Sequence, residues 1–193
     1  MPRRKKNYQV GDWFLVPLIG GGSGLGIVAR DDDGILLGYF FPEVYNEIPL
    51  ELEIRKLQPS DAILIKMLSD LHLLKNIWTV IFHTEDFKPS DWPLPKFGNL
   101  DIVDPSRAYI TRYPDDNIGD IGDMWEVKPN AILGLPKAGL AGAGAIESSL
   151  NRLLHPENGT DEIVFVTSSV QFSAPISNFP RQLHRLRHRR QRY

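Results

Sequence analysis

Carboxylates are the chemically active side chains that gather most densely in this sequence. The densest group lies in one short stretch and consists of Asp115, Asp116, Asp120, Asp123 and Glu126, with the aromatic Trp125 among them. A second group is the run Asp31, Asp32 and Asp33. A pair of carboxylates with shifted pKa values could carry out acid–base catalysis, but nothing in the sequence singles out such a pair among 24 acidic residues. Each group is therefore a candidate docking site for a basic partner, and the alternative for each is an ordinary solvated loop.

The glycine-rich stretch at 20–26 resembles a phosphate-binding loop at first sight. No glycine triplet in it satisfies GxGxxG, and Ile27 stands where the Walker spacing of Gly21 and Gly26 requires lysine. A nucleophile elbow would need glycine at the position of Leu25. The stretch therefore predicts a hairpin turn, for which glycine supplies positive φ angles at low cost.

The sequence contains no motif typical of a metal site, a reactive thiol or a cofactor site. The chain has no cysteine, and its five histidines stand at positions 72, 83, 155, 184 and 188. None of them has metal-ligand spacing to a carboxylate on an expected ordered element. The run Asp31–Asp33 lacks the downstream ligands of an EF-hand. We expect no catalytic residue, no cofactor and no metal site, and hence a protein that is not an enzyme. The alternative is an enzyme of unknown class, which a deep pocket with converging acids and His72 or His83 would favour.

The formal net charge of −2 conceals a strong asymmetry along the chain. Residues 3–6 and 181–192 hold 10 of the 22 Lys and Arg and none of the acidic residues. Residues 7–180 therefore combine 12 basic with 24 acidic side chains, a net charge of −12. An acidic body predicts a basic partner. The alternative is a small barrel-type module that binds nucleic acid through its basic ends, each cation releasing counterions on contact.

The cellular compartment is constrained by what the sequence lacks. No apolar run approaches the ~20 residues that a membrane-spanning helix needs. The basic start followed by an apolar run imitates a signal peptide, but Gly11, Asp12 and Pro17 interrupt it. The absence of cysteine fits a reducing compartment. We expect a cytoplasmic protein that makes no contact with a membrane.

The stretch Val10–Phe41 organises the first half of the chain. It contains three apolar runs separated by 20–24 and by the turn Asp31–Gly34, a pattern that predicts a three-stranded antiparallel meander. Alternation of Leu50, Leu52 and Ile54 with charged residues predicts a further strand. Further along we expect a strand at 62–65, one helical turn at 69–75 and a strand at 77–82.

The second half of the chain is richer in proline. Residues 85–100 predict an extended loop strapped over the sheet by Phe87, Trp92 and Phe97. Short strands are expected at 108–113 and 125–127, with an acidic turn between them. Apolar residues at helical spacing predict one amphipathic helix over Gly139–Leu154, which Pro156 ends. A last strand is expected at 162–167.

These elements together predict an α+β fold. It would be mostly antiparallel sheet, partly barrel-like, with an N-terminal meander and one packed helix near the C-terminus. We expect a disordered basic leader at 1–7, a single domain at 8–172 and an Arg-rich, disordered tail at 173–193.

The order of these features resembles the immunity protein 26 family of bacterial polymorphic toxin systems. The likeness begins with Gly11-Asp12-Trp13-Phe14-Leu15-Val16-Pro17-Leu18 and Gly24-Leu25-Gly26-Ile27-Val28. It continues through Trp78 and Val80, then Pro95-Lys96-Phe97, and ends with Ile146-Glu147 and Leu150. It covers about residues 10–154.

The resemblance implies a cytoplasmic protein that binds one cognate toxin domain and blocks it, with no reactive group of its own. An acidic face would speed the capture of a basic toxin, such as a nuclease. An aromatic anchor such as Trp125 would slow dissociation.

Overall fold

The meander predicted over 10–41 is confirmed in the computed structural model, which describes residues 6–120 and 122–156 and, at position 115, the backbone. Its strands are β1 (Asp12–Pro17), β2 (Ser23–Asp32) and β3 (Ile35–Tyr45), paired antiparallel in sequence order. Asp33 and Gly34 form the β2–β3 turn with φ angles of 48° and 95°. Two positive φ angles in succession are what an Asp-Gly hairpin turn requires.

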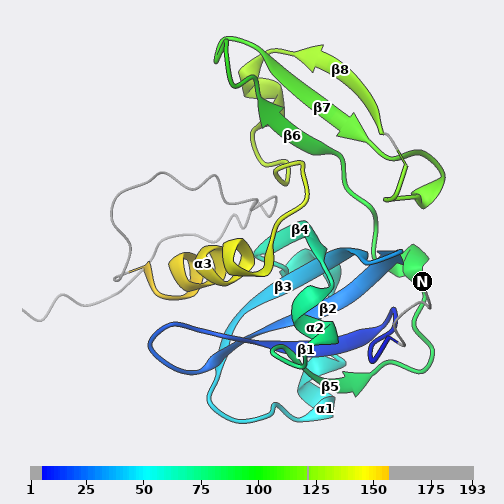
Figure 1. Cartoon of the computed structure of the whole chain (residues 1–193), viewed down its shortest axis with the longest axis vertical. Helices are drawn as coiled ribbons and strands as arrows, with labels where there is room; N and C mark the ends of the chain where they lie inside the picture. Colours follow the sequence, from blue (N-terminus) through cyan, green and yellow to red (C-terminus); the bar gives the residue numbers. More distant parts are fainter. Residues whose placement is uncertain (1–5, 121, 157–193) are drawn as a thin grey trace, which may run out of the picture.

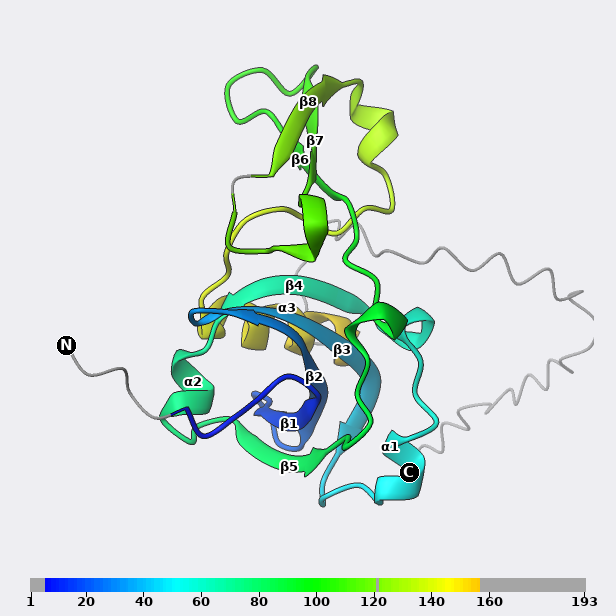
Figure 2. The ribbon, with the colours of Figure 1, turned by 90° about the vertical axis from the view of Figure 1, so that its right-hand side faces the viewer.

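Two further strands extend the meander into a five-stranded sheet. β4 (Leu64–Ser69) pairs with β3 and β5 (Thr79–His83) with β1, giving the order β4-β3-β2-β1-β5. The sheet curls strongly, as Figure 2 shows. It does not close, because β4 and β5 each pair with one strand in the described part of the chain. The barrel-like expectation is thereby corrected to an open, curled sheet.

Both faces of the five-stranded sheet are buried. Successive side chains in a strand point to opposite faces, so neighbours such as Trp13 and Phe14 enter two different hydrophobic clusters. The first cluster also contains Val28, Phe40 and Leu68, and the second contains their neighbours Ile27, Tyr39 and Met67. This is why the strands read as nearly continuous apolar runs.

The first cluster is covered by α3 (Ala143–Leu154) and by the short α2 (Leu71–Leu74). The predicted helix is present, but it begins four residues late because Gly139 has a φ of 97° and Gly142 is the N-cap. Ile146 and Leu150 are buried against the sheet. Figure 1 shows α3 lying along one side of the sheet.

The second cluster is covered by α1 (Glu51–Ile54) and by the proline-rich loop at 85–96. The prediction of a strand at 50–55 is wrong, because Ile54 is buried whereas Leu50 and Leu52 are exposed. The extended loop predicted at 85–100 ends at residue 96, because 97–100 form a strand. Aromatic rings hold the loop down: the Trp92 ring lies within about 6 Å of four others, those of Trp13, Tyr39, Phe41 and Phe87. Two 3-10 turns, η1 (Pro59–Asp61) and η2 (Pro89–Asp91), complete this side.

A second, three-stranded antiparallel sheet stands away from the first (Figures 1 and 2). It consists of β6 (Phe97–Leu100), β7 (Ala108–Arg112) and β8 (Asp123–Val127), in that order. The turns η3 (Pro114–Asp116) and η4 (Pro129–Ile132) flank β8 in the sequence. Phe97 anchors the base of this sheet in the second hydrophobic cluster.

The observed architecture is the predicted α+β class, with mostly antiparallel sheet and one packed helix near the C-terminus. The expected strand at 162–167, the tail at 173–193 and residues 1–5 of the leader lie outside the described residues. No helix in the described ranges is long and apolar enough to cross a membrane.

Candidate partner-binding surface

The structure divides the candidate acidic residues into two groups. The first group, here called the acidic corner, comprises the β2–β3 turn with Asp31, Asp32 and Asp33, and the loop 114–120 that lies against it. Asp115, Asp116 and Asp120 belong to that loop. The second group is strand β8, which carries Asp123, Trp125 and Glu126.

Arg30 fixes the acidic corner. It lies in β2 directly before the aspartate run and is 8% exposed. Its Nε and Nη2 donate to the two carboxylate oxygens of Asp116 at 2.6 and 2.9 Å. Its remaining bonds go to the carbonyl oxygens of Ala29, Pro89 and Trp92. A two-pronged ion pair of this kind restricts geometry as well as adding energy, so the loop 114–120 is held on the five-stranded sheet.

Two further contacts seat the same loop. Ile118 is buried in the second hydrophobic cluster. Gly119 lies so close to the Asp32 carboxylate that a Cβ at this position would overlap it. Beneath the loop, the Tyr39 hydroxyl donates to the Pro93 carbonyl oxygen. Burial raises the pKa of Tyr39 to about 12, with Arg30 opposing and Asp116 reinforcing the rise.

Asp70 and Tyr8 extend the acidic corner beyond what the sequence pattern indicated. The Tyr8 hydroxyl donates to the Asp70 carboxylate at 2.8 Å. Burial raises the pKa of Tyr8, and the hydrogen bond to Asp70 and the charges of Asp31, Asp70 and Asp33 raise it further. Lys6 forms an ion pair with Asp31 at 2.5 Å and offsets part of this charge. Several carboxylates therefore act on one corner of the molecule.

The β8 group has a different character. Asp123 forms an ion pair with Arg112 at 2.8 Å, and Glu126 forms one with Arg107 at 2.5 Å. The hydrogen bond from Arg107 lowers the pKa of Glu126. The Lys96 ammonium lies 5.8 Å from the Trp125 ring centroid. The carboxylates of β8 are thus held by cations of the same sheet, and its charge is more nearly balanced than that of the acidic corner.

Sequence reasoning did not single out Met124 or Arg30. Met124 is 66% exposed on β8, beside Trp125 at 38%. Arg30 had a readable signal, because an arginine inside an apolar strand must find buried acceptors. Met124 had none, since an isolated methionine is more often a core residue.

His72 and His83 each lie beside a carboxylate that is not part of the acidic corner. His83 Nδ1 is 2.8 Å from the Asp12 carboxylate, and His72 Nδ1 is 3.2 Å from Glu147, which also accepts from the Trp78 indole at 2.9 Å. A shallow hollow of about 520 Å³ is lined by residues that include Tyr39, Gln58 and Asp91. Within the described ranges, no three or more His, Asp or Glu are placed to hold a metal ion.

Comparison with known proteins gives one match. A family model described as Immunity protein 26 matches residues 9–108. This span contains all five strands of the first sheet and ends at the first residue of β7. No curated protein and no solved structure matches the chain.

Proposed function

Since the chain belongs to the Immunity protein 26 family, we propose that it neutralises a cognate bacterial toxin domain by binding it stoichiometrically and occluding its active surface. The observation that carries this proposal is the family match over residues 9–108, which takes in the whole five-stranded sheet. Neutralisation by occlusion needs a preformed surface and no reactive group. We further propose that the protein acts in the cytoplasm, where a toxin would meet its target.

The charge of the body supports a basic toxin. Residues 7–180 carry a net charge of −12, from 12 basic and 24 acidic residues. Opposite charges on two partners accelerate their encounter through electrostatic steering. A nuclease is one class of toxin with the required charge, because it must itself attract nucleic acid.

The acidic corner supports the same proposal by its rigidity. Arg30 ties Asp116 and the loop 114–120 to β2, and Ile118 anchors the loop in the core. A surface that is ordered before binding loses less conformational entropy on association. We propose that this corner, together with β8, makes up the toxin-facing surface, on which Trp125 is the aromatic anchor.

Co-expression tests the proposal directly. The toxin domain encoded by the gene next to this one is expressed in a bacterial host, alone and together with the full-length chain. We expect the toxin to stop growth when alone, and the chain to restore growth and to co-purify with the toxin at a 1:1 ratio. Growth arrest that persists while both proteins are soluble would refute the proposal.

A matched deletion separates immunity from the alternative of nucleic-acid binding. The variant lacks residues 1–6 and 181–193, which hold the clustered basic side chains. An immunity protein that uses its acidic body keeps protecting the host. A nucleic-acid module that uses its basic ends loses nucleic-acid binding on deletion, since those ends supply its phosphate contacts.

A further inference from the structure

Strand β8 is a sheet edge without the usual protection. The described residues contain four sheet edges: β4, β5, β6 and β8. A bridge from Ala141 covers part of β4 at Leu68, and a bridge from Lys137 covers part of β6 at Gly98. β5 is irregular, because its register against β1 shifts at Ile81. Among residues 6–120 and 122–156, no bridge to the outer side of β8 is found, and its pairing with β7 has no register shift.

The sequence of β8 also lacks lysine and proline, two residues that block sheet edges in natural proteins. Charged side chains and short length also blunt natural edges, and the five residues of β8 include the carboxylates of Asp123 and Glu126. These two charges disfavour an acidic incoming strand but not a basic one. β8 reads Asp-Met-Trp-Glu-Val and pairs regularly with β7 over its whole length. Its first four residues are exposed, as Figure 1 illustrates by the position of β8 on the outside of the upper sheet. Its outer backbone N–H and C=O groups can therefore accept another strand.

We propose that an extended basic segment of the cognate toxin pairs with β8 and adds a fourth strand to the sheet β6-β7-β8. This inference rests on the proposed function and specifies how the partner is held. Backbone hydrogen bonds would supply the pairing, and the alternating side chains of β8 would select the segment.

The side chains of β8 define the chemistry of the incoming strand. Asp123 and Trp125 point to one face of the sheet, whereas Met124 and Glu126 point to the other, because neighbours in a strand alternate. Cross-strand neighbours interact favourably when charges are opposite or both side chains are apolar. The segment therefore carries Lys or Arg opposite Asp123 and Glu126, with apolar residues opposite Met124 and Trp125.

Charge also argues against a second copy of this chain as the occupant. Two β8 strands that pair antiparallel about Trp125 would bring four carboxylates, Asp123 and Glu126 of each copy, along one short ladder. In that register Asp123 faces Val127 and Glu126 faces Met124 of the other copy, so neither carboxylate gains the opposite charge that stabilises a cross-strand pair. A basic segment instead finds two carboxylates whose present partners, Arg107 and Arg112, are exposed and exchangeable.

Amide hydrogen exchange of the full-length chain, free and bound to the toxin domain of the neighbouring gene, tests the pairing. We expect alternate amides of 123–127 to exchange rapidly in the free protein and at least about tenfold more slowly in the complex. A complex without new protection at β8 overturns strand addition and leaves the proposed function standing. Failure to form any complex overturns both. Amides already protected in the free chain also overturn the inference, because the edge would be occupied by the chain itself or by a second copy.

A pair of substitutions gives an independent readout. Met124→Lys places a cation on the edge, and Ile19→Lys makes the same kind of change at a residue that is 75% exposed in the β1–β2 turn. We expect Met124→Lys to raise the Kd for the toxin about tenfold or more, while Ile19→Lys leaves it within about twofold. Equal effects of the two substitutions would overturn the inference. Circular dichroism of both variants confirms that they fold.

Discussion

Arg30 shows how one side chain can set the shape of a surface that it hardly reaches. It is nearly buried, yet it holds Asp116 by two hydrogen bonds and two carbonyl groups of the proline-rich loop by two more. The acidic corner therefore depends on a cation beneath it. Removing a buried charge destabilises the fold, because its hydrogen-bond partners remain desolvated and are left without a compensating interaction.

Replacing Arg30 tests this role. We expect Arg30→Met to lower the free energy of unfolding by about 2 kcal/mol, less than for a fully buried pair because the Asp116 side chain is 47% exposed. Urea denaturation measures the change. The matched control is Arg112→Met, whose pair with Asp123 is exposed on both sides, and which we expect to cost under about 0.5 kcal/mol. Equal costs for the two substitutions would show that Arg30 does not hold the corner.

Tyr39 gives the fold a dependence on alkaline pH. Burial raises its pKa from 10.0 to about 12, so the folded state keeps a proton that the unfolded state has lost. This contribution is fully present below pH 10 and is lost as the pH rises toward 12. The free energy of unfolding should fall by up to about 1.4 kcal/mol per pH unit in this window on account of Tyr39. Tyr39→Phe should make the slope of urea-derived stability against pH shallower, and an unchanged slope would contradict the assignment.

At the scale of elements, close packing is as important as turn geometry. Gly26 lies in the centre of β2, where a Cβ would meet the ring of Phe14 at 2.7 Å and that of Phe40 at 2.9 Å. Gly144, near the start of α3, has no atom within 4 Å of such a Cβ. The same substitution should therefore have opposite effects at the two positions.

We expect Gly26→Ala to lower the free energy of unfolding by about 1–3 kcal/mol, because two buried rings must shift. We expect Gly144→Ala to raise it by about 0.5 kcal/mol, since alanine favours the helix and meets open space. Thermal and urea denaturation of both variants measure the difference. A stabilised Gly26→Ala variant would mean that β2 and its neighbours pack less closely than the structure shows.

The elements that the sequence predicted well are those whose signals are local. The turn at Asp33-Gly34 and the helix around Ile146 and Leu150 are encoded by neighbouring residues. The prediction of a strand at 50–55 is wrong because three alternating apolar residues fit both a strand and one exposed helical turn. In the structure Ile54 is buried and the other two are exposed, as a helical turn allows. Strands β7 and β8 were predicted at 108–113 and 125–127, whereas β6 was expected to be part of the extended loop at 85–100. The pairing of the three strands into a separate sheet was not predicted, because four residues of β6 are too few to show a clear alternation.

The candidate site was predictable to a similar extent. The aspartates at 31–33 and those of the loop 114–120 were visible as local clusters, whereas the two segments are brought together by a contact between Arg30 and Asp116, which are 86 residues apart in sequence. Nothing local distinguishes Asp116, held by an arginine, from Asp120, which follows it in the same loop. Which of these carboxylates the toxin contacts remains a prediction.

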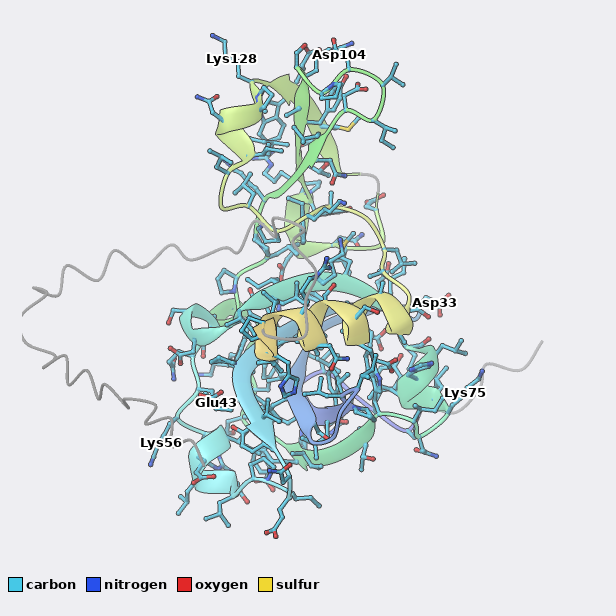
Figure 3. The ribbon with its side chains drawn as sticks, turned by 90° about the vertical axis from the view of Figure 1, so that its left-hand side faces the viewer. Asp33, Glu43, Lys56, Lys75, Asp104 and Lys128 are labelled. Carbon is cyan, nitrogen blue, oxygen red and sulfur yellow. The ribbon has the colours of Figure 1, made fainter. Side chains whose placement is uncertain are left out.

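At the scale of the whole molecule, the acidic corner and the region around Glu43 lie on different parts of the five-stranded sheet, as the labels of Asp33 and Glu43 in Figure 3 show. This separation allows a charge-matched test of steering. The variant Asp32→Asn/Asp33→Asn/Asp120→Asn removes three negative charges at the corner, and Glu43→Gln/Glu47→Gln/Glu53→Gln removes three elsewhere.

We expect the corner variant to bind the toxin domain with an association rate about three- to tenfold lower at low salt, because local charge dominates steering. The matched variant should change the rate less than about twofold. In stopped-flow measurements the association rates of the variants should converge as the ionic strength rises, since salt screens exposed charges. Identical rates for the two variants at low salt would remove the acidic corner from the encounter surface.

The central claim is that this chain neutralises a toxin by occupying it, with no bond made or broken. Titration of the purified toxin domain of the neighbouring gene with increasing amounts of the full-length chain tests the claim most directly, with residual toxin activity as the readout. The account predicts a linear decline that reaches zero at one chain per toxin and does not change with incubation time. Complete inactivation by a small fraction of an equivalent, progressing with time, would contradict it and would establish an enzyme instead.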